Sequence, residues 1–372
     1  MGVAAVSGIL DTTIALVFTY IAYKTGAYIH KYTPYSYPNA RIKAMEAKLF
    51  DEQRFNELAE SRNLENFVAS LEDTAYREYL TTLGGDITPW NIERALDEAL
   101  ADTYLLMAKI MPGRVRDFFK LLADRWDVKN IVNVVKARAA GEDPERYIVE
   151  AGSLFGRVQA MAEAKTPEEM LVALEGTQYA EPYQRYLLGE ISLAEFETKL
   201  YRRYCGTLKD YVSSRKGDER VILEEFMRLR VERVNVLTIL RAKRSGIPPE
   251  VIERFILPGG KLKLEPLINA EDLGMALAEL DSTEYGKVIW EVRETVEKDL
   301  TVIEPVLSRY ILRRMRDMER FYPLSVATAV AYTLEKEEEV RKLKAIAKLI
   351  HDGVEPDRIK ELVSEAELVE EV

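Results

Sequence analysis

The segment Leu71-Glu72-Asp73-Thr74-Ala75-Tyr76 decides the fold, because its pattern of Leu, acid, any residue, Thr, any residue and Tyr returns twice. The later copies are Leu174-Glu175-Gly176-Thr177-Gln178-Tyr179 and Leu280-Asp281-Ser282-Thr283-Glu284-Tyr285. Tyr76 and Tyr179 are 103 residues apart, and Tyr179 and Tyr285 are 106 apart. We interpret each copy as a helix–helix junction, in which the Thr hydroxyl accepts a free N–H of the next helix and the Tyr packs across the corner. A ligand-binding role for the tyrosines is the alternative.

Two further patterns occur three times, always in the same order after the first. One is a capping residue followed by an apolar residue, a glutamate and a leucine, and its glutamates are Glu93, Glu197 and Glu304. The other is an acid, then Asn or Lys three residues later, then a glycine that we expect to end a helix in the left-handed conformation. Its copies are Asp127/Asn130/Gly141, Glu232/Asn235/Gly246 and Glu339/Lys342/Gly353. Three patterns in fixed order at a nearly constant offset indicate internal repeats.

The sequence between the repeated patterns predicts helices. Apolar residues recur at spacings of three and four, for example over residues 92–111 and 221–244, and no run alternates with period two. Thr88-Pro89, Thr166-Pro167 and Ser192 with Glu195 are typical helix starts. The fold class is therefore all-α.

The predicted organisation is an N-terminal extension followed by three homologous helical units of about 105 residues. The units span residues 32–142, 143–247 and 248–372, after an extension over residues 1–31. Repeats of this size are longer than those of a solenoid, so we expect three small bundles instead. Three equivalent bundles can pack around a pseudo-threefold axis and leave a central opening, which would give a funnel-like body.

Several charged residues have predicted partners. We expect Glu93, Glu197 and Glu304 to be half buried. In the first two units their partners would be Arg138 and Arg241, each within its own unit. The acidic run at residues 335–339 is interpreted as a solvated helix face. Its i,i+4 ion pairs would be Glu337–Arg341 and Glu338–Lys342.

Composition excludes several classes of function. The net charge of −11 argues against a general nucleic-acid binder. One cysteine, Cys205, allows no intramolecular disulfide, and two histidines provide no pair at metal-binding spacing. No P-loop, nucleophile elbow or paired aspartate box is present. We expect no catalytic residue, cofactor or metal, and a reducing cytoplasmic setting.

The extension at residues 1–31 is unusually apolar. Asp11 is its only charged residue before Lys24, and residues 12–23 are uncharged and mostly apolar. Asp11 as an N-cap would start a helix over residues 12–28 that docks on protein or lipid. A membrane-spanning helix and a disordered start are the alternatives, and a central aspartate makes spanning costly.

The segment Tyr35-Ser36-Tyr37-Pro38-Asn39-Ala40-Arg41-Ile42-Lys43-Ala44-Met45 resembles the N-terminal motif of the C subunit of archaeal and bacterial A/V-type ATP synthases, the counterpart of the vacuolar ATPase d subunit. The resemblance extends over about residues 32–372 and includes the threefold repeat. It implies a non-catalytic, funnel-like protein at the cytoplasmic face of the membrane. Its partners would be the central-stalk shaft subunits and the proteolipid rotor ring. The extension before Tyr32 departs from the usual family pattern, and our hypothesis is that it anchors the protein to the ring or to lipid.

Two other classes compete with this interpretation. An unrelated helical adaptor would share the repeats but would lack the Asn-Ala-Arg motif and the apolar N-terminus. An all-helical enzyme, such as a prenyl transferase, would need paired acidic motifs facing a cavity, and the sequence does not show them.

Overall fold

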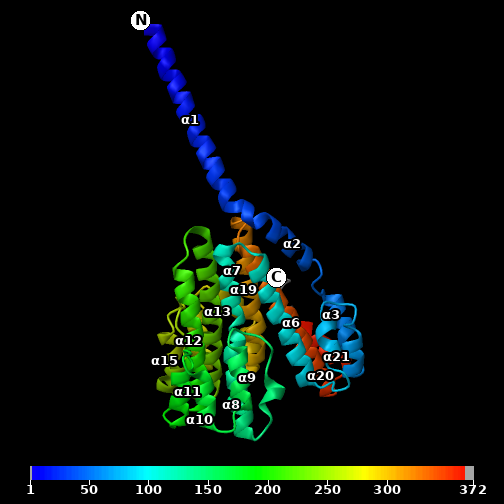
Figure 1. The fold of residues 1–372 in the computed structure, drawn as a ribbon. Coiled ribbons are helices and arrows are strands. Elements are labelled where there is room, and N and C mark those ends of the chain that lie inside the picture. The colour runs from blue at the N-terminus through cyan, green and yellow to red at the C-terminus, as the bar shows by residue number, and fades with distance from the viewer. Residues whose placement is uncertain (1, 365–372) are drawn as a thin grey trace.

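Every element in the described part of the chain is a helix, which confirms the all-α class. The computed structural model describes the backbone of residues 2–364 and the side chains of residues 15–363. The chain begins with the long helix α1 (Gly2–Tyr32), a 3-10 turn (Thr33–Tyr35) and α2 (Ser36–Glu46). α1 projects away from the helical body as an arm (Figure 1).

The arm corrects one prediction. Because α1 starts at Gly2 and continues through residue 11, Asp11 is not an N-cap, and the helix is longer than the predicted 12–28. The Asp11 side chain lies outside the described residues. Within the described residues, no helix combines the length and apolarity that crossing a membrane requires.

The body repeats one arrangement: short helices, then two long ones. In the first repeat the helices are α3 (Glu52–Ala59), α4 (Leu64–Ala69), α5 (Arg77–Thr81), α6 (Pro89–Ile110), α7 (Gly113–Ala123) and α8 (Arg125–Ala140). In the second they are a 3-10 turn (Pro144–Tyr147), α9 (Phe155–Glu163), α10 (Pro167–Leu174), α11 (Ala180–Leu187), α12 (Leu193–Ser213) and α13 (Gly217–Arg244). α7 and α8 together cover the stretch that corresponds to the single helix α13.

The third repeat contains more short elements. They are α14 (Pro249–Ile252), a 3-10 turn (Glu253–Phe255), α15 (Glu265–Asn269), α16 (Leu273–Leu280), α17 (Gly286–Trp290), α18 (Arg293–Lys298), a 3-10 turn (Leu300–Val302), α19 (Ile303–Phe321), α20 (Ala327–His351) and α21 (Pro356–Ser364). The long pair α19 and α20 thus corresponds to α12 and α13.

Several predicted helix ends are confirmed. The hydroxyl groups of Thr88, Thr166 and Ser192 accept the N–H three residues later, and Ser192 forms a full capping box with Glu195. The predicted left-handed glycines Gly141, Gly246 and Gly353 have φ values of 72°, 65° and 73°.

The last long helix of each repeat packs with the repeat that follows. One buried cluster joins residues 128–135 of α8 to side chains of α9, α10, α11 and α12. α13 packs against α16 and α19, and α20 packs against α3 and α6 at the other end of the chain. The buried contacts therefore cross positions 142 and 247, and the division into bundles at 32–142, 143–247 and 248–372 stays a prediction.

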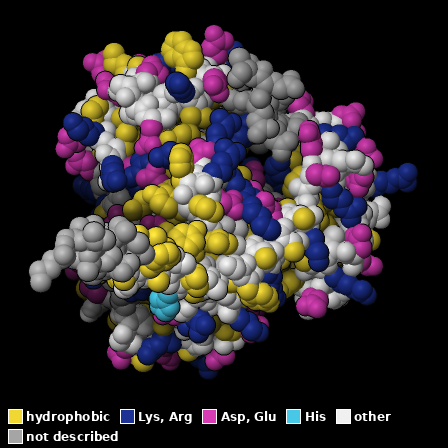
Figure 2. Space-filling model, turned by 90° about the horizontal axis from the view of Figure 1, so that it is seen from above, with side chains coloured by type: hydrophobic (Ala, Val, Ile, Leu, Met, Phe, Trp, Pro, Cys, Tyr) yellow, Lys and Arg dark blue, Asp and Glu magenta, His cyan; other side chains and the backbone are white. Residues whose placement is uncertain are grey.

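A hollow lies between the long helices. Two cavities of about 400 and 680 Å³ share five lining residues and are bordered by α6, α8, α12, α13, α19 and α20. Seen from above, the body is hollowed near its middle, and Lys and Arg side chains with some Asp and Glu surround the hollow (Figure 2).

Candidate functional site

The three repeated threonines form the same tight turn. Thr74, Thr177 and Thr283 each donate to the carbonyl of the leucine three residues earlier, at 2.6–2.7 Å. Each hydroxyl also accepts the N–H of the tyrosine two residues later, at 3.2 Å. The helices α5, α11 and α17 begin directly after these tyrosines, whose rings are buried. The threonine therefore fixes the direction in which each tyrosine enters the core.

Tyr76 joins the first repeat to the last. Its hydroxyl donates to Glu339 Oε1 at 2.6 Å, and Glu339 Oε2 accepts the N–H of Phe50 at 2.7 Å. Lys336 donates to the same carboxylate at 2.6 Å. Burial and the Glu339 charge raise the pKa of Tyr76, so its hydroxyl keeps the proton that it donates.

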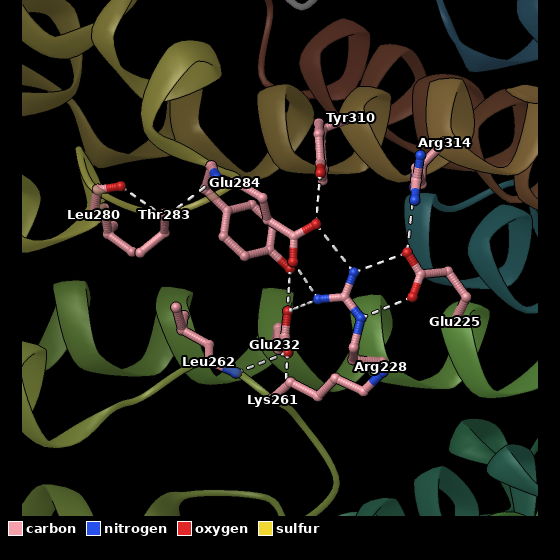
Figure 3. Close-up of polar contacts among 11 residues, drawn as sticks. Glu225, Arg228, Glu232, Lys261, Leu262, Leu280, Thr283, Glu284, Tyr310 and Arg314 are labelled. Atoms are coloured by element: carbon pink, nitrogen blue, oxygen red, sulfur yellow. Dashed lines mark hydrogen bonds and ion pairs between the residues drawn. The ribbon is translucent and has the colours of Figure 1, made fainter.

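Tyr285 joins the third repeat to the second in the same way, through Glu232. Figure 3 shows Glu232 among Arg228, Lys261 and Leu262. Glu232, on α13, accepts the Tyr285 hydroxyl at 2.5 Å and the N–H groups of Lys261 and Leu262 at 2.5 and 3.0 Å. The Arg228 guanidinium donates to Glu232 at 2.7 Å. One buried carboxylate thus connects α13, the loop at residues 261–262 and Tyr285. An arginine neutralises the charge of this carboxylate.

We call this set of contacts around Glu232 a joint between two repeats. Arg228 extends the joint toward α19. Its guanidinium also contacts Glu225 at 2.9 Å and Glu284, which accepts the Tyr310 hydroxyl at 2.8 Å. Arg314 of α19 pairs with Glu225 at 3.2 Å. The network is satisfied on all sides, which is what a buried charge cluster needs to be stable.

Asp127 makes the equivalent joint between the first and second repeats, with one methylene less. It accepts the N–H of Leu154 at 2.9 Å and the Ser153 hydroxyl at 3.2 Å. Within residues 15–363, no hydrogen bond joins it to the buried Tyr179, and no cation contacts it. Burial therefore raises the pKa of Asp127 to about 7, against the lowering effect of the Leu154 N–H.

The residues three positions after these acids hold the same loops. Asn130 exchanges two hydrogen bonds with the backbone of Val149, at 2.8 and 2.9 Å. Asn235 does the same with Leu257, both at 2.8 Å. Lys342 takes this place in the third copy, where its ammonium lies 4.9 Å from the centre of the Phe55 ring. Each side chain fixes the start of another repeat.

The repeated glutamates pair both within and between repeats, and their partners differ from the predicted ones. Glu93 contacts Lys129 at 3.2 Å and Lys344 at 3.6 Å. Glu197 pairs with Lys136 at 2.9 Å. Neither contacts its predicted partner: Glu93 pairs with Lys129 of α8, the same helix as Arg138, and Glu197 pairs with a lysine of the preceding repeat.

The two predicted arginines have other roles. Arg138 donates to the carbonyls of Ala162 and Ala164, the latter at 2.7 Å, and so caps the end of α9. Arg241 pairs with Glu304 at 2.9 Å instead of Glu197. The predicted arginine partners were therefore wrong. Of these ion pairs, the contact of Glu93 with Lys129 stays within one predicted unit, and the others link two repeats.

A charged cluster lines the hollow. Glu337 pairs with Arg125 at 2.6 Å and with Arg230 at 2.9 Å, and it accepts the Tyr104 hydroxyl. Burial alone would raise the pKa of Glu337, but the two arginines lower it to about 2. The carboxylate is therefore ionised at neutral pH.

This cluster corrects the interpretation of residues 335–339 as a solvated face. Glu337 and Glu339 are both in buried contacts, and Glu338 pairs with Arg341 rather than Lys342. The predicted pairs Glu337–Arg341 and Glu338–Lys342 do not form because the helix turns this face toward α8 and α13.

Sequence reasoning missed Arg125, Arg230 and Glu337, although a signal existed. Each lies two residues before a repeated acid, at Asp127, Glu232 and Glu339. Equivalent positions of three repeats meet in one place, and only the third copy has changed sign. Aligning the repeats for complementary charges could have found the cluster.

The arrangement provides binding surfaces rather than reaction chemistry. Within the described residues, no group of three or more Asp, Glu, His or Cys could hold a metal ion. Each buried carboxylate described above is neutralised by a cation or held by backbone N–H groups. The geometry defines a helical body built from interlocked repeats, with an exposed apolar arm and a charged hollow.

Comparisons with known proteins identify the family. Residues 38–362 match the family model described as ATP synthase (C/AC39) subunit. A relative from Thermococcus onnurineus, named as the C subunit of an A-type ATP synthase, is 61% identical over 98% of this chain and 100% of its own length. Relatives with the same name from Thermococcus gammatolerans (98% of this chain, 99% of its own) and Methanocaldococcus jannaschii (89% and 86%) are 58% and 32% identical. The chain therefore belongs to the ATP synthase (C/AC39) subunit family, which confirms the resemblance.

Proposed function

We propose that the protein is a non-catalytic central-stalk component of a rotary A-type ATP synthase, which couples the rotating shaft to the membrane proteolipid ring. The observation that carries the proposal is the family match over nearly the whole chain. Such a protein would be peripheral, at the cytoplasmic face of the membrane.

The joints between repeats support a role in transmitting torque. The contacts run from the first repeat to the second through Asp127, from the second to the third through Glu232, and from the third back to the first through Glu339. A closed cycle of this kind is what three bundles around a pseudo-threefold axis would form. Because a load on one repeat is shared by both neighbours, the cycle favours a stiff body.

The apolar arm supports contact with the ring or with lipid. Leu16, Phe18, Ile21 and Tyr23 on α1 are all exposed, and they point in different directions around the helix. A helix that is apolar all round is normally buried against protein or lipid. We infer that α1 faces the ring, while the central hollow receives the foot of the shaft.

Affinity purification from gently solubilised membranes tests the proposal. The tagged chain should recover stalk subunits and proteolipid, identified by mass spectrometry. Deletion of residues 1–31 should reduce the recovery of proteolipid and leave stalk subunits bound.

A matched pair of variants separates anchoring from a loss of folding. Leu16 on the arm and Leu188, beside α11 on the body, are each 67% exposed. Leu16→Ser, combined with Phe18→Ser and Ile21→Ser, should weaken proteolipid recovery, whereas Leu188→Ser should not. Recovery of a soluble monomer, or of unrelated partners alone, would overturn the rotor assignment in favour of an adaptor.

A further inference from the structure

The arm α1 has a concentration of exposed apolar side chains. Among the described residues, 21 large hydrophobic side chains are exposed, and eight of them lie between residues 16 and 29. The eight are Leu16, Val17, Phe18, Tyr20, Ile21, Tyr23, Tyr28 and Ile29. The remaining thirteen are spread over the helical body. A contiguous apolar surface marks a binding surface, whereas single exposed apolar residues do not.

These side chains surround the arm on all sides. Successive residues of an α-helix are turned by about 100°, so Leu16, Phe18 and Ile21 point in three different directions. A helix that docks on one face of a protein needs only one apolar stripe, with polar residues opposite. Over residues 15–23 the arm has one non-aromatic hydroxyl, Thr19, which donates to the carbonyl four residues earlier at 2.8 Å. The arm therefore fits apolar surroundings on every side better than a single protein face.

The chemical character of the arm changes along its axis. Residues 15–23 carry no charge, and Lys24 is the first charged side chain that follows them toward the body. Tyr23 and Tyr28, on either side of Lys24 in the sequence, are 72% and 59% exposed. Tyr and Lys side chains are favoured where an apolar medium meets water, because each joins an apolar part to a polar end. The order from uncharged to aromatic and basic matches the change of polarity with depth in a bilayer.

The charged side chains along this stretch are all basic. Residues 12–45 contain no Asp or Glu, in a chain that has 63 of them among 372 residues. Lys31 and Lys43 in this stretch pair with acids of the body, at 2.7 and 2.9 Å. Lys24 and Arg41 contact tyrosines instead. Lys24 is therefore available to anionic headgroups, which attract Lys and Arg next to a membrane.

We propose that the arm binds the surface of a bilayer that contains anionic lipid. Leu16, Phe18 and Ile21 lie among the acyl chains, while Tyr23 and Lys24 lie at the level of the headgroups. The inference rests on the proposed function, which brings a membrane to the arm, and it adds the lipid as the partner. Contact with lipid is compatible with the proposed ring, since the ring lies in the same bilayer.

Vesicle flotation of the purified full chain tests the binding. Vesicles of phosphatidylcholine with phosphatidylglycerol should carry the chain to the top of a density gradient, and vesicles of phosphatidylcholine alone should bind it less. Lys24→Gln should weaken binding to the anionic vesicles about fivefold and leave binding to the neutral ones unchanged. Lys165→Gln is the matched control, because Lys165 is exposed beside α10, at the end of the body away from the arm (Figure 1).

A fluorescent label whose emission shifts to the blue in apolar surroundings tests the depth. It would be attached to a cysteine introduced by Phe18→Cys, Tyr28→Cys or Leu188→Cys. The native Cys205 is buried, and burial raises the pKa of its thiol to about 11, so it reacts little with the label. On addition of anionic vesicles, the emission should shift strongly at position 18, less at position 28 and not at position 188 on the body.

Several results would contradict lipid binding. They are a failure to float, equal flotation with both kinds of vesicle, and equal shifts at positions 18 and 188. A blue emission at position 18 without vesicles would show that a second copy of the chain covers the arm. Binding only to vesicles with reconstituted proteolipid would assign the arm to the ring instead. Because the assay contains neither shaft nor ring, lipid binding and the rotor role can fail independently.

Discussion

The joint at Glu232 and the joint at Asp127 occupy the same place in two repeats but differ by one methylene. Glu232 reaches the tyrosine hydroxyl, two backbone N–H groups and an arginine. Asp127 reaches one backbone N–H and one serine, and its pKa rises to about 7. A repeated position can therefore keep its place in the fold while the charge and the pKa of its side chain change. One joint is a satisfied ion cluster, and the other is a buried acid that titrates near neutrality.

The two joints should differ most in the free energy of unfolding that is lost when each carboxylate is removed at pH 8. Glu232→Ala leaves two N–H groups, a tyrosine and part of Arg228 without partners, and it should lower the free energy of unfolding by about 3–5 kcal/mol. Asp127→Ala should cost below about 1 kcal/mol, because fewer partners are lost and a buried charge that disfavours folding at this pH is removed as well. Guanidinium denaturation measures both. Equal losses would show that the two joints contribute equally to stability.

The second largest effect should be a pH dependence of stability that comes from Asp127. The folded-state pKa is raised to about 7 from an ordinary value of 3.8, so the protonated form is favoured by folding. This contribution is fully present below about pH 4 and is lost as the pH rises to about 7. Asp127→Asn mimics the protonated form and should stabilise the protein by about 2–4 kcal/mol at pH 8.

The same variant should change stability little at pH 4. Thermal unfolding of both proteins at the two pH values checks this. A stabilisation of the same size at both pH values would mean that the effect of Asn is steric rather than due to charge.

Removing the tyrosine hydroxyls should have a smaller effect. Tyr285→Phe loses a hydrogen bond to a charged group and should cost about 1.5–3 kcal/mol. Tyr179→Phe should cost below about 0.5 kcal/mol, because its hydroxyl makes no bond to Asp127. The midpoints of chemical denaturation measure the stability that each of the two variants loses. If Tyr179→Phe were as harmful as Tyr285→Phe, the two joints would not differ as described.

The smallest effect on stability is expected from the exposed ion pair that joins the first and second repeats. Lys136 and Glu197 pair at 2.9 Å, but their side chains are 49% and 36% exposed. Lys136→Ala should therefore cost below about 1 kcal/mol, and the loss should disappear in about 1 M salt. Stability measured with and without salt tests this. A large loss that resists salt would place the pair among the structural joints.

The sequence predicted the local features well. The helix caps at Thr88 and Ser192 and the left-handed ends at Gly141 and Gly246 depend on neighbouring residues, so periodicity and capping rules were sufficient. The turn around each repeated threonine is also a local hydrogen-bond pattern. The partners of charged residues were predicted badly. Arg138 and Arg241 were chosen because they lie in the same repeat as Glu93 and Glu197, and position in a repeat does not specify which side chains meet in space.

The sequence by itself determined that the chain is helical, that it is built from a triplicated pattern, and that it resembles one family. These properties follow from spacing, capping and composition, which act over a few residues. Only the tertiary structure decided that each acid contacts the next repeat, that Arg125, Arg230 and Glu337 meet in one cluster, and that Asp127 has no cation beside it among the described residues. The physical reason is that the energy of a buried charge depends on which groups surround it in space, and the order of residues along the chain does not specify that surrounding.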